Sequence, residues 1–208
     1  MRKRTCLSLL LLCLPILGVP QTRTSPKTAL PTLGEGKKDS PMVVETFTDY
    51  QCPPCRQLYL GTLRRLIEDY CNTGKVYLLH HDFPWPQHAY ARQTARWGLA
   101  AAVIGKYETV SEALYTKQES IAANGNIEAA VAEVLSPAEL KKLKEVMIAR
   151  GAEIDAAIDK DKAFGEQQGV SSTPSIKITY KGSVVAPLNP GVIPYAILKR
   201  FLDEQLAK

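Results

Sequence analysis

The sequence has little excess charge, and this excludes one class of partner. Its formal net charge is +5, from 26 Lys and Arg against 21 Asp and Glu. Three of the basic residues, Arg2, Lys3 and Arg4, lie at the start, so from residue 21 onward 23 basic residues face 21 acids. The remaining balance of +2 gives no basic surface of the kind that binds nucleic acid or an anionic membrane. We therefore expect neither as a partner.

The N-terminal apolar run is too short for a typical transmembrane helix. It extends over 14 residues, from Cys6 to Val19, and follows the basic start MRKR. This order is typical of a secretory signal peptide. We predict a signal peptide over residues 1–20 and export to the periplasm or another extracytoplasmic space. Because LGVPQT is a poor cleavage site, an uncleaved membrane anchor is the alternative.

Cysteine is sparse, and its placement is informative. Cys6 and Cys13 fall in the predicted signal peptide, which leaves Cys52, Cys55 and Cys71. An oxidising compartment permits disulfides, and an odd count leaves one thiol over. Sixteen residues separate Cys71 from Cys55, about 24 Å along a continuous helix. We expect Cys71 to be a buried apolar residue rather than a member of an active pair.

The order of the predicted elements indicates an α/β fold without internal repeats. Residues 21–40, rich in Pro, Gly, Ser, Thr and Lys, predict a flexible linker before one domain at residues 41–208. Two strand-like segments flank an amphipathic helix, which predicts a right-handed βαβ unit with parallel strands. Helical patterns fill about residues 87–168, and a ββα unit ends the chain. The predicted strands lie at 42–48, 76–83, 174–180 and 184–188, and the final helix at 195–208.

The stretch FTDYQCPPCRQLY places a C-x-x-C motif where a strand ends and a helix begins. Free N–H groups and the helix dipole at this point favour a thiolate on Cys52. Cys55 lies one turn further in and can close a disulfide with Cys52 that opens again by thiol exchange. The motif therefore predicts a redox-active Cys52–Cys55 disulfide, with Cys52 as nucleophile and Cys55 as resolving thiol. Pro53 and Pro54 are tolerated because N–H groups of the first turn have no helical partner.

Two other interpretations of the motif are open. A structural disulfide is one, although a bridge that closes so short a loop contributes little stability. A zinc or copper site with His80 and His81 is the other, but neighbouring residues of a strand point to opposite faces. The sequence favours the redox couple, with no resident metal and no other cofactor.

Four segments together resemble the DsbA-like thioredoxin-fold oxidoreductases: FTDYQCPPC, TGKVYLLHHDFPW, GVSSTPSIKITYKG and PYAILKRFLDEQL. The resemblance implies a thioredoxin-like fold (βαβ … ββα) with an inserted helical block. It also implies that Cys52 is the exposed nucleophile and Cys55 its buried partner. Pro174 matches the proline that follows a cis peptide bond, which would place the backbone of Thr173 beside the sulfurs, ready to pair with an extended client.

The same resemblance implies an activity and partners. It predicts an exported thiol:disulfide oxidoreductase that oxidises cysteines of unfolded secreted proteins. A membrane partner of the DsbB or vitamin K epoxide reductase type would reoxidise it. A reductase or isomerase on the same site is the alternative, and a copper-delivery protein or a non-catalytic interaction domain of this fold is the alternative from another class. Tyr50, Trp85 and Tyr90 either line a client groove or pack in the core.

Two departures from the family pattern bear on the chemistry. Members often carry a buried acid six residues before the first cysteine, where this chain has Thr46. Glu45 is one residue away and should face the other side of the strand, so Asp49 or water is left to accept a proton from the inner thiol. Pro53 and Pro54 offer no N–H and no side-chain donor, which predicts a less oxidising disulfide.

Overall fold

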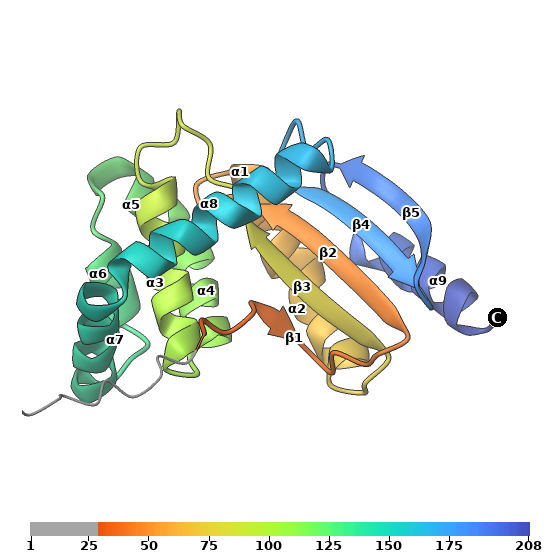
Figure 1. Cartoon of the computed structure of the whole chain (residues 1–208), viewed down its shortest axis with the longest axis horizontal. Coiled ribbons are helices and arrows are strands. Elements are labelled where there is room, and N and C mark those ends of the chain that lie inside the picture. Colours follow the sequence, from red (N-terminus) through yellow and green to blue (C-terminus); the bar gives the residue numbers. More distant parts are fainter. Residues whose placement is uncertain (1–28) are drawn as a thin grey trace, which may run out of the picture.

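In the computed structural model, which describes residues 29–208, a five-stranded mixed sheet carries helices on both faces (Figure 1). The strand order is β1-β3-β2-β4-β5, with β2 and β3 parallel and all other neighbours antiparallel. The α/β thioredoxin-like prediction is therefore confirmed. The predicted signal peptide, with Cys6 and Cys13, lies outside the described residues. The strands are β1 (Gly34–Glu35), β2 (Met42–Thr48), β3 (Val76–Asp82), β4 (Ser175–Tyr180) and β5 (Ser183–Pro190).

A continuous helical segment joins β2 to β3, as predicted, but it is not regular α-helix. It runs through α1 (Pro53–Leu58), η1 (Tyr59–Leu63), α2 (Arg64–Leu66) and η2 (Ile67–Cys71), where η1 and η2 are π-helical. Its apolar residues include a spacing of five, which suits a π turn better than an α turn. Burial of a large apolar side chain stabilises a fold by about 1.5–3 kcal/mol. The five apolar residues that predicted this helix are all buried: Leu58, Leu63, Leu66, Ile67 and Tyr70.

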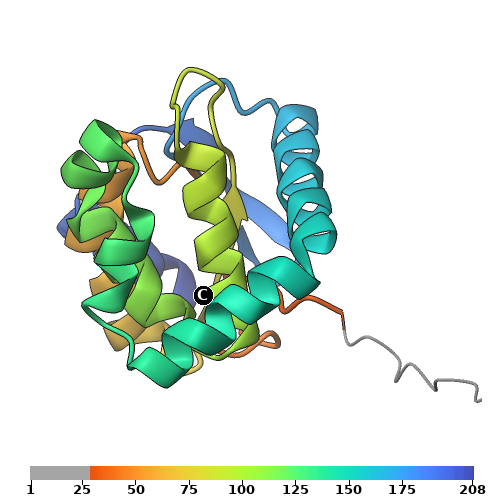
Figure 2. The ribbon, with the colours of Figure 1, turned by 90° about the vertical axis from the view of Figure 1, so that its left-hand side faces the viewer.

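The predicted helical block is present between β3 and β4. Figures 1 and 2 show most of it beside the sheet, while α8 returns across the face of β2 and β3, and α9 packs near α2 on the opposite face. The predicted helix start at Ser136 is confirmed by a capping box with Glu139. These helices are α3 (Ala91–Val103), α4 (Tyr107–Thr116), α5 (Gln118–Asn124), α6 (Ile127–Ala132), α7 (Pro137–Ala149), α8 (Gly151–Gln167) and α9 (Tyr195–Leu206).

The predicted linker at residues 21–40 is wrong for the end that the structure describes. Strand β1 lies within it and pairs with β3, and Leu33 is buried. Gly36 has a φ of +90°, and a Cβ there would lie 2.5 Å from the carbonyl oxygen of Val76. Such a position accepts glycine because the backbone must pass close to its neighbour. A Gly-rich composition that suggested flexibility therefore reflects tight packing.

Cys71, the third cysteine of the predicted mature domain, belongs to the core. It lies at the end of η2, is 2% exposed, and burial raises the pKa of its thiol to about 12. It is a buried core residue, as predicted. Within residues 29–208, no helix combines the length and the apolar character needed to cross a bilayer.

Candidate active site

Cys52 and Cys55 lie at one edge of the sheet, where β2 leads into α1. Cys52 is the N-cap residue of α1, with φ −82° and ψ 115°, and its N–H donates to the carbonyl of Asp49 at 3.1 Å. Pro53 and Pro54 occupy the first helical positions. Both cysteines are free thiols, so the structure holds the reduced pair. Cys55 is fully buried, and Cys52 is only 6% exposed, so it is less exposed than the resemblance implies, although it lines a surface hollow.

The two thiols have opposite electrostatic environments. A hydrogen bond from the Cys55 thiol, with contributions from the Thr173 side chain and the Cys55 backbone N–H, lowers the pKa of Cys52 to about 6 despite its burial and the charge of Asp49. Burial, together with the hydrogen bond and charge of Cys52, raises the pKa of Cys55 well above its ordinary range. At neutral pH the pair therefore holds a thiolate on Cys52 and a proton on Cys55. Thiol exchange needs this division, because the thiolate is the attacking species.

The segment before β4 meets the cysteines from the other side. The Cys52 thiol contacts the carbonyl of Thr173 at 3.2 Å, and the Thr173–Pro174 peptide bond is cis. Trp85 donates from Nε1 to the Thr173 hydroxyl oxygen at 2.9 Å, so the hydroxyl hydrogen of Thr173 stays available for donation to another acceptor. Because β2 and β3 are parallel and β4 is antiparallel to β2, the loops after β2 and β3 and the loop before β4 share one edge. The topology brings these distant residues together.

Sequence reasoning missed two polar residues of this site. His88 pairs with the fully buried Asp49, and Gln118 of α5 donates to the backbone carbonyls of Tyr50 and Cys52 at 2.7 and 3.0 Å. His88 carried a usable signal, because it follows the strand that runs parallel to β2. Gln118 carried none, since it belongs to the inserted helices.

The three aromatic residues near the motif divide between core and groove. Tyr50 is buried and its hydroxyl contacts Ser111, while Tyr90 packs against the core. Trp85 borders the hollow, so it is the aromatic residue available to a bound client. The hollow is lined by Cys52, Trp85, Gln87, His88, Ser171, Ser172 and Thr173.

Thr46, which occupies the position of the family's buried acid, contacts a histidine of the neighbouring strand. Thr46 is fully buried, and its hydroxyl lies 3.2 Å from Nδ1 of His80. Glu45 faces the other side of β2, as predicted, where it contacts Nε2 of His81 at 3.5 Å and Lys177 at 2.8 Å. His80 and His81 thus have separate partners on separate faces. In the described part of the chain, no group of three or more His, Cys, Asp or Glu side chains could hold a metal ion.

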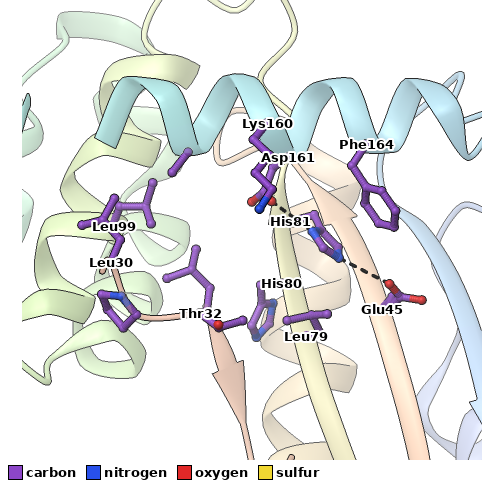
Figure 3. A pocket seen from close by; sticks show the side chains of 13 residues that line it. Leu30, Thr32, Glu45, Leu79, His80, His81, Leu99, Lys160, Asp161 and Phe164 are labelled. Carbon is purple, nitrogen blue, oxygen red and sulfur yellow. Dashed lines mark hydrogen bonds and ion pairs between the residues drawn. The ribbon is translucent and has the colours of Figure 1, made fainter. Parts of the chain in front are cut away.

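His81 links the sheet to α8 beside a cavity (Figure 3). Asp161 of α8 lies 3.2 Å from Nδ1 of His81, opposite Glu45, and Phe47 stacks on the ring. Burial alone would lower the pKa of His81, but the hydrogen bonds and charges of Asp161 and Glu45 outweigh it and raise the pKa to about 9. This buried charge cluster therefore favours the charged histidine.

The raised pKa of His81 predicts that the fold is less stable at alkaline pH. The pKa of His81 is higher in the folded state than its unfolded value of 6.5, so protonation of His81 stabilises the fold. This stabilisation is fully present below pH 6.5 and is lost as the pH rises through 9. We expect the free energy of unfolding to fall by about 2–3 kcal/mol between pH 6 and pH 9.5. Urea unfolding at a series of pH values measures it.

This titration is best followed in the disulfide form. In the dithiol form the lowered pKa of Cys52 makes the fold more stable as the pH rises, which opposes the effect of His81. The stabilisation of the fold by the Cys52 thiolate is fully present above pH 9 and is lost as the pH falls through 6. A His81→Gln variant keeps a polar side chain between the carboxylates but cannot titrate. An identical pH dependence in this variant and in the unaltered protein would contradict the assignment.

Comparisons with known proteins agree with this geometry. A family model described as Thioredoxin matches residues 29–190. A curated relative from Bacillus cereus, named "Probable disulfide bond formation protein D", is 25% identical over 182 residues, covering 83% of this chain and 78% of its own. Among solved structures, alpha-DsbA1 of Wolbachia pipientis has a TM-score of 0.66 at 16% identity, covering 84% of this chain and 90% of its own. Oxidised BdbD from Bacillus subtilis has a TM-score of 0.66 at 18% identity, covering 85% and 94%. These two structural likenesses show the fold.

Proposed function

Because this chain belongs to the thioredoxin family, as a thiol:disulfide oxidoreductase of the DsbA-like kind, we propose that it oxidises cysteine pairs of secreted proteins through Cys52 and Cys55. One observation carries the assignment of the two sulfurs. Cys52 has a lowered pKa and borders a hollow, while Cys55, one turn inside, is fully buried and stays protonated. An outer nucleophile with an inner resolving thiol is the arrangement that thiol exchange requires.

The proposed reaction begins with the Cys52–Cys55 disulfide. A client thiolate attacks Cys52, forms a mixed disulfide there, and releases Cys55 as the leaving group. The second client thiol then attacks the client sulfur of the mixed disulfide, and Cys52 departs as a thiolate. The client loses two electrons and two protons; the protein gains both electrons, Cys55 takes one proton, and the other proton goes to solvent. The lowered pKa of Cys52 favours the last step, because a sulfur of low pKa leaves faster.

We propose that an extended client segment binds in the hollow beside Cys52. Thr173 presents its backbone at the sulfur, and Trp85 adds an apolar surface at the rim. Main-chain pairing of this kind recognises a polypeptide without selecting a sequence. We therefore propose unfolded or reduced secreted proteins as clients, with Pro53, Pro54, Thr173 and Pro174 shaping the site.

The proposal includes location and reoxidation. The basic start and apolar run of the N-terminus support export to an extracytoplasmic space, where an oxidase of secreted proteins must work. After each turnover the dithiol has to pass its electrons on. We propose a membrane redox partner of the DsbB or vitamin K epoxide reductase type, which would accept them at the same Cys52.

The reduction potential of Cys52–Cys55 tests the direction of electron flow. The chain without its first 28 residues is equilibrated across glutathione ratios, quenched by alkylation, and weighed. Because the pKa of Cys52 is lowered to about 6, we expect a value more oxidising than about −270 mV. A value toward about −120 to −180 mV would mark an oxidase. A value near about −270 mV would instead mark a reductase. If the two thiols do not form a disulfide, the redox assignment itself is wrong.

A further inference from the structure

A histidine–carboxylate pair lies beside Cys52, and the exchange steps described above leave it unused. Nδ1 of His88 is 2.7 Å from Oδ2 of Asp49. The Asp49 carboxylate is fully buried and also accepts hydrogen bonds from the backbone N–H groups of Gln51 and Trp85, at 2.7 and 2.8 Å. Three donors hold this carboxylate in one orientation. Asp49 is therefore a rigid partner for the imidazole.

The pairing fixes which nitrogen of His88 can meet a client. Asp49 accepts from Nδ1–H, so the neutral ring carries its lone pair on Nε2. The His88 side chain is 27% exposed, and within residues 29–208 its Nε2 makes no hydrogen bond or ion pair. The edge of the ring that faces Asp49 is thus occupied, and the opposite edge carries the basic nitrogen.

The hollow contains the reacting sulfur and the imidazole with few competing charges. Of its seven lining residues, two carry an ionisable side chain, Cys52 and His88. The others are Trp85, Gln87, Ser171, Ser172 and Thr173, none of which carries a charge. Asp49 is the carboxylate that faces the imidazole from behind. Because Cys52 and His88 both line this hollow, a client sulfur bonded to Cys52 would lie in the space that His88 borders.

We propose that His88 is a catalytic base for thiol exchange at Cys52, with Asp49 as the residue that positions it. This inference rests on the proposed exchange at Cys52. In the mixed disulfide, the second client thiol gives its proton to Nε2 of His88, and the resulting thiolate attacks the client sulfur. The client disulfide forms, the bond to Cys52 breaks, and its electron pair leaves on Cys52 as a thiolate. The imidazolium, stabilised by Asp49, then releases its proton to solvent.

Such a base has a defined task, because client thiols are mostly protonated at neutral pH. A thiol of ordinary pKa, about 8.5, is roughly 3% ionised at pH 7, so the greatest gain from a perfect base is about 30-fold. By microscopic reversibility, the same residue returns the proton when a client disulfide is reduced. The role therefore holds for either direction of electron flow.

The test compares His88→Asn with the unaltered protein in single-turnover oxidation of a synthetic peptide that contains two cysteines. The asparagine amide can still donate to Asp49 but offers no base. At pH 7 we expect the oxidation rate to fall about tenfold, within the ceiling set by thiol ionisation. Near pH 9.5, where the peptide thiols ionise unaided, the two rates should converge. Added imidazole should restore the rate of His88→Ala at pH 7.

Two readouts separate this role from a structural one. The reduction potential of Cys52–Cys55 should be the same in His88→Asn and in the unaltered protein, because a base changes rates and not equilibria. A rate ratio that stays constant from pH 6 to pH 9.5, or a potential shift that accounts for the slower rate, would overturn the proposal. If the unaltered protein fails to oxidise the peptide at all, the proposed function is what fails.

Discussion

Replacing Cys55 with alanine is expected to abolish catalytic oxidation of a dithiol client and to convert the protein into a covalent trap. Cys55 is fully buried one turn from Cys52, so in a mixed disulfide it attacks the Cys52 sulfur as an intramolecular neighbour and releases the client sulfur as a thiolate. Intramolecular groups react with effective concentrations of about 10⁵ M or more, which no external thiol reaches. Without Cys55, the Cys52 thiolate attacks client disulfides and remains bonded to them. Turnover should fall at least about a thousandfold.

Two matched variants define this result. Cys52→Ala should form no mixed disulfide and show no turnover, because the outer sulfur is gone. Cys71→Ala should behave like the unaltered protein, since Cys71 is a core residue at the far end of the helical segment. Mass spectrometry without reductant, after incubation with an oxidised two-cysteine peptide, measures the complex. Turnover in Cys55→Ala, or a complex in Cys52→Ala, would show that the roles of the sulfurs are misassigned.

The sequence predicted the parts of the site that depend on local rules. A strand that ends before C-x-x-C and a helix that begins within it were readable from residue types, and they place Cys52 at a helix start. The alternation of a strand also predicted that Glu45 and Thr46 point apart, and the ion pair of Glu45 with His81 agrees. These inferences hold because they rest on geometry within a few residues.

The rest of the site depends on contacts between distant segments. Asp49, Trp85 and His88 meet because the loops after two parallel strands share one edge of the sheet, and no local pattern specifies the contact. Gln118 reaches the C-x-x-C motif from the inserted helices, whose packing the sequence leaves undetermined. The linker prediction failed for the related reason that Gly36 permits close packing here, although glycine also occurs in flexible segments.

Replacing Pro54 with alanine or histidine is expected to make the disulfide more oxidising. The side chain of an N-cap residue accepts hydrogen bonds from the N–H groups of the second and third helical residues. For Cys52 the second is Pro54, which has no N–H, and the third is Cys55, whose N–H contributes to the lowered pKa of Cys52 although it makes no capping hydrogen bond to the Cys52 side chain in this structure. Pro54→Ala therefore restores one missing donor to the thiolate. Pro54→His restores it and adds an imidazole.

The expected size of the change follows from the link between pKa and potential. The thiolate exists only in the reduced form, so each further donor to it stabilises that form and raises the reduction potential. Above pH 6, one unit of pKa on Cys52 corresponds to about 1.4 kcal/mol and about 30 mV. We expect about 30 mV for Pro54→Ala and about 60 mV for Pro54→His. The glutathione equilibrium used for the unaltered protein measures both.

Pro53→Ala is the matched control, because it restores an N–H at the first helical position, which does not reach the N-cap side chain. Its potential should stay near that of the unaltered protein. If Pro53→Ala and Pro54→Ala shift the potential equally, the effect comes from loosening the motif rather than from a specific donor. If neither Pro54 variant shifts it, the missing N–H does not set the potential. The thiolate would then owe its stability mainly to the Cys55 thiol and to Thr173, which are the other donors at Cys52.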